Sequence, residues 1–199
     1  MRGLRTGRLL LLVLCLGAQP PGRAASLYHI DQRHGTIEFS VGILGMFSVQ
    51  GRFPRFQGDL LLDTEHPERS HVDVAIDTNA IEMPLSEQTD LLRSAAYFDT
   101  AHFPQGRFVS GPIQALSPSR YLIHGTLWIR GIAQPQDLDA VIQDRHTDMA
   151  RRIEVADFVV TGRIRRSAFG MVADRIMVSD TVRITIRIHL EVGLAPDGG

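Results

Sequence analysis

From residue 26 onward apolar and polar residues alternate with a period of two, and this pattern restricts the fold more than any other feature of the chain. Its clearest instance is the segment 182–190, with apolar side chains at Val182, Ile184, Ile186, Ile188 and Leu190. Successive side chains of a strand point to opposite faces, so such a segment buries one face and exposes the other. The alternation recurs at 36–41, 56–62 and 71–77, and more weakly at 107–110, 121–129, 138–142 and 153–164. The chain is therefore predicted to be almost entirely antiparallel sheet.

Turn-forming residues separate these segments at 64–68, 117–120 and 130–135. Glycines within the predicted strands, at Gly51, Gly58, Gly125 and Gly162, are typical of the close bends that curl a sheet. Together they predict one antiparallel β-barrel domain of eight or more strands without an internal linker.

One segment interrupts the alternation, at Thr89–Thr100. It predicts a single short helix from about Ser86 to Ala95, with Ser86 as N-cap and Glu87 placed to complement the helix dipole. A lone helix within a run of strands suggests a barrel with a plug or flap. Barrels of this size either fill their interior or hold one small ligand there.

The first 25 residues are typical of a cleavable secretory signal. Three arginines precede an apolar core from Leu9 to Leu16, which is shorter than the ~20 residues of a membrane-spanning helix. Cleavage at Cys15, as in a lipoprotein, is disfavoured because Leu14 is large. We therefore expect cleavage near Ala24–Ser26 and a protein located in the periplasm or secreted.

Such cleavage would remove the only cysteine, so no disulfide and no thiolate chemistry would remain. It would leave 17 basic and 22 acidic residues, a net charge of −5, which argues against nucleic acid as a partner. Every basic residue is arginine, which excludes Schiff-base chemistry and a phosphate-loop lysine. The folded domain is predicted to span 26–194, with 195–199 as a flexible tail.

Motifs for catalysis or metal binding do not stand out. The eight histidines include no pair at the spacing of a zinc helix, and no serine lies in a G-x-S-x-G elbow. The sequence therefore predicts no catalytic residue, no metal ligand and no required cofactor. An esterase-like enzyme acting on small apolar substrates remains an alternative without a positive signal.

The apolar faces of the predicted strands pose the functional question. From periodicity alone, an ordinary filled core is the simpler interpretation, and a tunnel for an apolar chain is the functional one. Period-two alternation identifies which side chains face inward, but it does not show whether they meet in the middle.

A series of motifs, in order along the chain, resembles the YceI-like family of exported, lipocalin-like lipid-binding proteins. The resemblance covers essentially the whole mature chain. The matching segments are Tyr28–Asp31, Ile37–Val41, Gly51–Phe53, Phe56–Gly58, Asp90–Asp99, Phe103–Pro104, Phe108–Ser110, Gly125–Gly131 with Pro135, Arg166–Gly170 and Ser179–Val182.

The resemblance implies an all-β fold, an eight-stranded antiparallel lipocalin-like barrel, whose elongated cavity holds a polyisoprenoid chain. The ligand would be a quinone tail or a prenyl phosphate, with transient membrane contact and a homodimer as further expectations. The tunnel lining is then expected to comprise Phe39, Val41, Phe56, Leu60, Val74, Ile76, Phe108, Leu127, Ile184 and Ile186. A ligand-free barrel that serves as a periplasmic accessory or stress protein for a membrane redox system is the alternative.

The chain departs from the family at the predicted mouth. Where relatives often carry a basic or histidine residue, it has Gly42–Leu44, so a more apolar mouth is expected. Met46–Phe47 and the Pro84–Leu85 step are expected to line this entrance.

Overall fold

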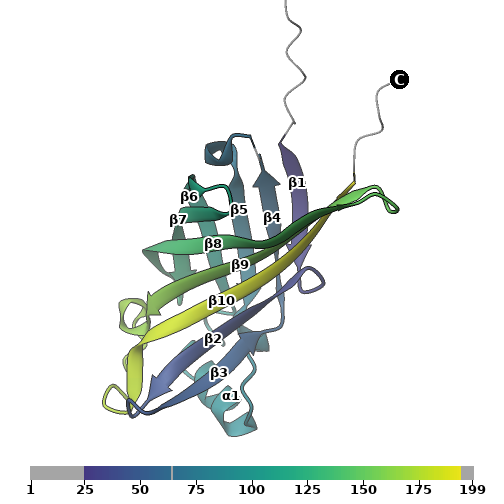
Figure 1. Cartoon of the computed structure of the whole chain (residues 1–199). Coiled ribbons are helices and arrows are strands. Elements are labelled where there is room, and N and C mark those ends of the chain that lie inside the picture. The colour runs from purple at the N-terminus through teal and green to yellow at the C-terminus, as the bar shows by residue number, and fades with distance from the viewer. Residues whose placement is uncertain (1–24, 64, 194–199) are drawn as a thin grey trace, which may run out of the picture.

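The computed structural model describes residues 25–63 and 65–193. The predicted signal segment up to residue 24 and the predicted tail 195–199 lie outside the described residues. Ten strands, one α-helix and three short 3-10 turns make up the described chain (Figure 1). Their bounds are β1 Ser26–Asp31, β2 Gly35–Ile43, β3 Phe47–Phe53, β4 Phe56–Leu62, η1 Pro67–Arg69, β5 His71–Asp77, η2 Thr78–Ala80, α1 Ser86–Arg93, β6 Gln105–Ser117, β7 Arg120–Ile129, β8 Ile132–Asp148, β9 Ile153–Arg165, η3 Arg166–Phe169 and β10 Val178–Gly193.

All strands belong to one antiparallel sheet in the order β1-β4-β5-β6-β7-β8-β9-β10-β2-β3. The two ends of this order are parts of a single bent hairpin, because β1 leads into β2 and β3 leads into β4. Asp31 pairs with Gln57 in the β1–β4 half, and Ile37 pairs with Phe53 in the β2–β3 half. The hairpin therefore closes the sheet on itself. The predicted all-β antiparallel barrel is confirmed, and the count is ten strands instead of eight because two strands are each broken at the bend.

Helix α1 lies across one end of the barrel (Figure 1). The predicted position of the helix is correct, but Ser86 is not its N-cap. The N-cap is Leu85, which makes no side-chain cap bond. Instead the Thr89 hydroxyl organises the first turn, because it accepts the N–H of Met83 (3.0 Å) and donates to the carbonyl of Leu85 (3.3 Å). No helix within the described part of the chain is long and apolar enough to cross a membrane.

The predicted turn at 130–135 is shorter than expected. A two-residue hairpin turn at Arg130 and Gly131, with φ of 52° and 70°, joins β7 to β8. Pro135 therefore lies within β8. It is tolerated there because β8 pairs with β9 only from Leu138 onward, so the missing N–H of Pro135 faces no neighbouring strand.

Two predicted glycine sites show why the sheet can curl tightly. A Cβ at Gly58 would collide with the carbonyl oxygen of Asp73 on β5, and one at Gly125 with the ring of Phe108 on β6. Glycine therefore allows close approach between neighbouring strands at both places.

Buried apolar side chains form two clusters inside the barrel. One includes Phe108, Leu127 and Phe169, and the other includes Phe53 and the fully buried Ile81. The two clusters lie on facing walls, and the space between them is where a ligand could sit.

Candidate functional site

An apolar cavity of about 530 Å³ occupies the barrel interior. All ten strands and α1 contribute to its lining. Its volume falls in the range of small-molecule sites, ~300–1,000 Å³. The inward side chains therefore do not fill the barrel from wall to wall.

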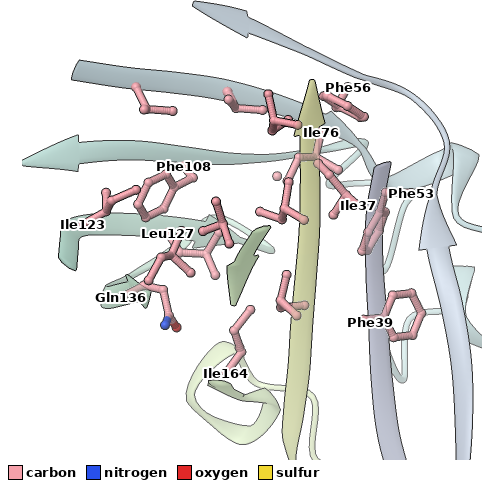
Figure 2. Close-up of a pocket in the computed structure, with 18 of the residues that line it drawn as sticks. Ile37, Phe39, Phe53, Phe56, Ile76, Phe108, Ile123, Leu127, Gln136 and Ile164 are labelled. Atoms are coloured by element: carbon pink, nitrogen blue, oxygen red, sulfur yellow. The ribbon is translucent and has the colours of Figure 1, made fainter. Parts of the chain in front are cut away.

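Every side chain that the sequence assigned to a tunnel wall lies on the wall of this cavity. These are Phe39, Val41, Phe56, Leu60, Val74, Ile76, Phe108, Leu127, Ile184 and Ile186. Figure 2 shows Phe39, Phe56, Phe108 and Leu127 among the side chains that line the cavity. Contact between these ten residues and a ligand stays a prediction.

Two members of the aromatic group at the α1 end of the cavity, Phe53 and Phe98, were not predicted from the sequence. Phe53 packs against Phe39 (ring centroids 5.4 Å apart) and, edge to face, against Phe98 (5.7 Å). Both Phe53 and Phe98 line the cavity. Phe98 follows the helix, where no alternation marks a buried face, so periodicity could not identify it.

The end of the cavity farthest from α1 is polar, and its charges are paired. Arg145 forms an ion pair with Glu154 at 2.6 Å. Buried Asp63 accepts N–H bonds from His66 (2.7 Å) and Glu65 (3.1 Å). Asp63, Arg145 and Glu154 all line the cavity. A polar group of a ligand would meet satisfied charges there, and an apolar tail would lie toward the middle.

Near α1, the buried Arg166 holds the chain segment that leads into β10. Its guanidinium donates to the carbonyl oxygens of Met171, Ala173, Val178 and Ser179 at 2.6 to 3.0 Å. It also lies 6.0 Å from the centre of the Tyr97 ring. Four carbonyl dipoles therefore satisfy this charge, and the segment 171–179 is fixed beside the cavity.

Tyr97 ties the same segment to the chain that follows α1. Its hydroxyl donates to the carboxylate of Asp174 at 2.7 Å. Burial, together with this hydrogen bond, raises the pKa of Tyr97 to about 12. The phenol therefore stays protonated at physiological pH and acts as a hydrogen-bond donor.

The histidines do not assemble a site. Within residues 25–63 and 65–193, no group of three His, Cys, Asp or Glu side chains could hold a metal ion. His29 bonds to Asp59 (3.1 Å) and His34 to Asp31 (3.0 Å), so the two do not meet. His189 bonds to Asp157 (2.7 Å) on the outer face of the sheet.

The predicted entrance residues do not line the main cavity. Met46 and Phe47 instead line a separate, shallow groove with the segment 175–180. Pro84 and Leu85 are exposed and belong to neither lining. Met83, which precedes α1, and Leu91 and Leu92, in its last turn, border the cavity at this end.

The sequence matches a known domain over most of its length. The YceI-like domain matches residues 28–190. Among curated relatives, Protein YceI of Salmonella arizonae is 29% identical over 169 residues, which cover 83% of this chain and 86% of the relative.

Solved structures share the fold. BcnA of Burkholderia cenocepacia superposes with a TM-score of 0.70 at 21% identity, covering 81% of this chain and 99% of BcnA. The YceI protein of Campylobacter jejuni gives 0.68 at 22% identity, covering 73% and 86%. A polyisoprenoid binding domain from Saccharophagus degradans, implicated in plant cell wall breakdown, gives 0.59 at 13% identity, covering 85% and 99%.

Proposed function

The chain belongs to the YceI-like family, and we propose that it is an exported carrier that holds a polyisoprenoid-type lipid in its barrel. The ligand class is the apolar tail of a quinone or of a prenyl phosphate. The observation that carries the proposal is the apolar cavity of about 530 Å³, whose lining comes from every strand. The polyisoprenoid binding domain from Saccharophagus degradans, which has a similar fold, supports the same ligand class.

The energetics of such a site are favourable. Burying apolar carbon contributes about 0.8 kcal/mol per CH₂, so one five-carbon unit contributes on the order of 3–4 kcal/mol gross. Three or four units would offset the ~4–15 kcal/mol of freedom lost on association. Affinity would therefore come from the tail, and the protein would tolerate different head groups. This role needs no catalytic step and no metal.

The direct test is mass spectrometry of organic extracts from the protein exported by its own signal segment. Wild-type protein should release a polyisoprenoid-type lipid. In the variant Ile184→Glu, a carboxylate would face the apolar cavity, and the folded protein should release little or no lipid.

A matched control introduces the same charge on the outer face of the same strand. Thr181 is exposed on β10, so Thr181→Glu should retain lipid at the wild-type level. Circular dichroism would establish that both variants are folded. Equal lipid content in folded Ile184→Glu and in wild type would refute the assignment of the cavity as the binding site.

A further inference from the structure

Most arginines on the surface of the barrel are paired with a carboxylate. The pairs include residues of neighbouring strands and of α1. They are Arg33–Asp31, Arg52–Glu82, Arg55–Asp77, Arg93–Asp90, Arg107–Asp73, Arg120–Asp139, Arg145–Glu154, Arg151–Glu191 and Arg187–Glu38.

Arg163 and Arg183 are among the exposed arginines without such a pair. They are directly opposite each other on β9 and β10, and both are exposed. Neither side chain makes an ion pair or hydrogen bond with any residue in the described part of the chain. Two carboxylates on this side of the sheet are hydrogen-bonded to other residues instead. Asp137 on β8 bonds to His124 (2.8 Å), and Asp180 bonds to Ser167 (2.8 Å). Like charges directly opposite each other destabilise a sheet, so this arrangement lowers stability in the isolated protein.

Several highly exposed apolar side chains lie at the end of the barrel where β9 ends and β10 begins. Ile176 is 97% exposed, Met46 79% and Phe47 65%. They belong to two loops, β2–β3 and η3–β10, which the hydrogen bond from the Leu44 N–H to the Met177 carbonyl joins (2.8 Å). Figure 1 shows these loops side by side at the α1 end of the barrel. Arg175 of the η3–β10 loop lines the groove between them and is exposed, without an ion pair within residues 25–63 and 65–193.

We name this region the loop face, comprising the segments 44–47 and 175–177 together with Arg163 and Arg183. Val178 lines both the shallow groove between the loops and the main cavity, and Leu91 of α1 lines the cavity while half of it is exposed. Val178 therefore lies at the boundary between the groove of the loop face and the cavity.

We propose that the loop face docks on an anionic lipid bilayer. Ile176, Met46 and Phe47 would enter the boundary between head groups and acyl chains, and the three arginines would meet lipid phosphates. The chain as a whole has a net charge of −1, so this concentration of unpaired positive charge gives the molecule one side complementary to an anionic surface. Apolar loop tips combined with basic side chains supply the two contributions that stable interfacial binding needs. The proposed docking depends on the proposed function in one respect: its purpose would be the transfer of a lipid tail through the α1 end of the barrel.

The test is flotation of the purified full chain with vesicles of phosphatidylcholine alone or of phosphatidylcholine with phosphatidylglycerol. Wild type should bind the vesicles that contain phosphatidylglycerol, and added salt should weaken this binding. The double variant Arg163→Gln with Arg183→Gln should lose about fivefold in partition coefficient for each arginine. Ile176→Ser combined with Phe47→Ser should also reduce binding several-fold.

Matched controls remove the same groups elsewhere. Arg120→Gln with Arg151→Gln removes two paired arginines, and Met149→Ser removes an exposed apolar side chain from the β8–β9 turn at the far end of the barrel. Both controls should bind vesicles like wild type. The Arg163 and Arg183 variant should also unfold at a temperature at or above that of wild type, because a like-charge repulsion is gone.

The results of lipid extraction and of vesicle flotation distinguish failure of the docking proposal from failure of the proposed function. Lipid extracted from the loop-face variants should equal that from wild type, because none of the substituted residues lines the cavity. Wild-type protein that carries lipid but fails to bind anionic vesicles would overturn the docking proposal alone. Vesicle binding by a protein that never carries lipid would overturn the proposed function alone. Analytical ultracentrifugation tests the other occupant. If wild type is a dimer that the loop-face variants lose, while their vesicle binding equals that of wild type, the occupant is a second copy of the chain and the bilayer proposal is wrong.

Discussion

The inner and outer faces of β10 belong to the same backbone but differ in their chemistry. Its inner face carries Val182, Ile184 and Ile186, which border the cavity. On the outer face Arg187 pairs with Glu38 at 2.6 Å. Such exposed pairs contribute ~0–1 kcal/mol each, whereas a buried large apolar side chain contributes ~1.5–3 kcal/mol.

The inner and outer faces of the barrel therefore contribute differently to the protein. The inside supplies the stability and, through its hollow part, the proposed ligand affinity. The outside sets charge, and on the loop face it leaves Arg163, Arg175 and Arg183 without an ion pair within the described residues. Substitutions should therefore have large effects on stability inside the barrel and small effects outside it.

The largest effect is expected at a packed part of the interior. Phe169 on η3 is buried against the cluster that includes Phe108 and does not line the cavity. Phe169→Ala should lower the free energy of unfolding by about 3–5 kcal/mol, measured by urea denaturation. Phe47→Ala, at an exposed position, should change it by less than about 0.5 kcal/mol. Similar losses for the two variants would contradict the assignment of stability to the interior.

A smaller effect is expected where two strands approach closely. In Gly58→Ala the new methyl group would meet the Asp73 carbonyl, so β4 and β5 would have to separate locally. The expected loss is about 1–3 kcal/mol, seen as a lower melting temperature. Gly111→Ala is the control, because its Cβ would make an ordinary contact at 3.7 Å with the His124 carbonyl. A Gly58→Ala protein as stable as Gly111→Ala would show that the strands are not held this closely.

Outer-face ion pairs should contribute still less. A double-mutant cycle of Arg187→Gln and Glu38→Gln should give a coupling energy of about 0.2–1 kcal/mol. About 1 M salt should reduce it, because both side chains are roughly half exposed. A coupling of several kcal/mol would mean that the outer face is an important source of stability.

The smallest effect concerns pH. The hydrogen bond to Asp157, assisted by Glu191, raises the pKa of His189 above its ordinary value of about 6.5. Since the folded-state pKa is the higher one, the stabilisation is fully present below about pH 6.5 and is lost as the pH rises through the folded-state value. The difference in unfolding free energy between wild type and His189→Gln should therefore be larger at pH 6 than at pH 9. It should stay below about 1 kcal/mol because of solvent exposure. A difference that grew with pH would contradict the pairing.

The main features of the fold could be predicted from the sequence because they are local. The alternation along 182–190 requires only that successive side chains of a strand point to opposite faces. It identified the inward residues, and all ten assigned to a wall lie on the cavity. The helix was located because its segment lacks this alternation, but its N-cap was assigned wrongly because Thr89, six residues after Met83, organises the start.

Other features depend on strands that are distant in the sequence. Whether the barrel is hollow depends on the register and stagger around the closed sheet, which set its diameter. The placement of Phe98 against Phe53 depends on how the segment after α1 folds back over the barrel end. The opposition of Arg163 and Arg183 depends on the pairing of β9 with β10. Residue order therefore determined which side chains face inward, whereas the tertiary structure alone decided how far apart the walls stand and which charges remain without partners.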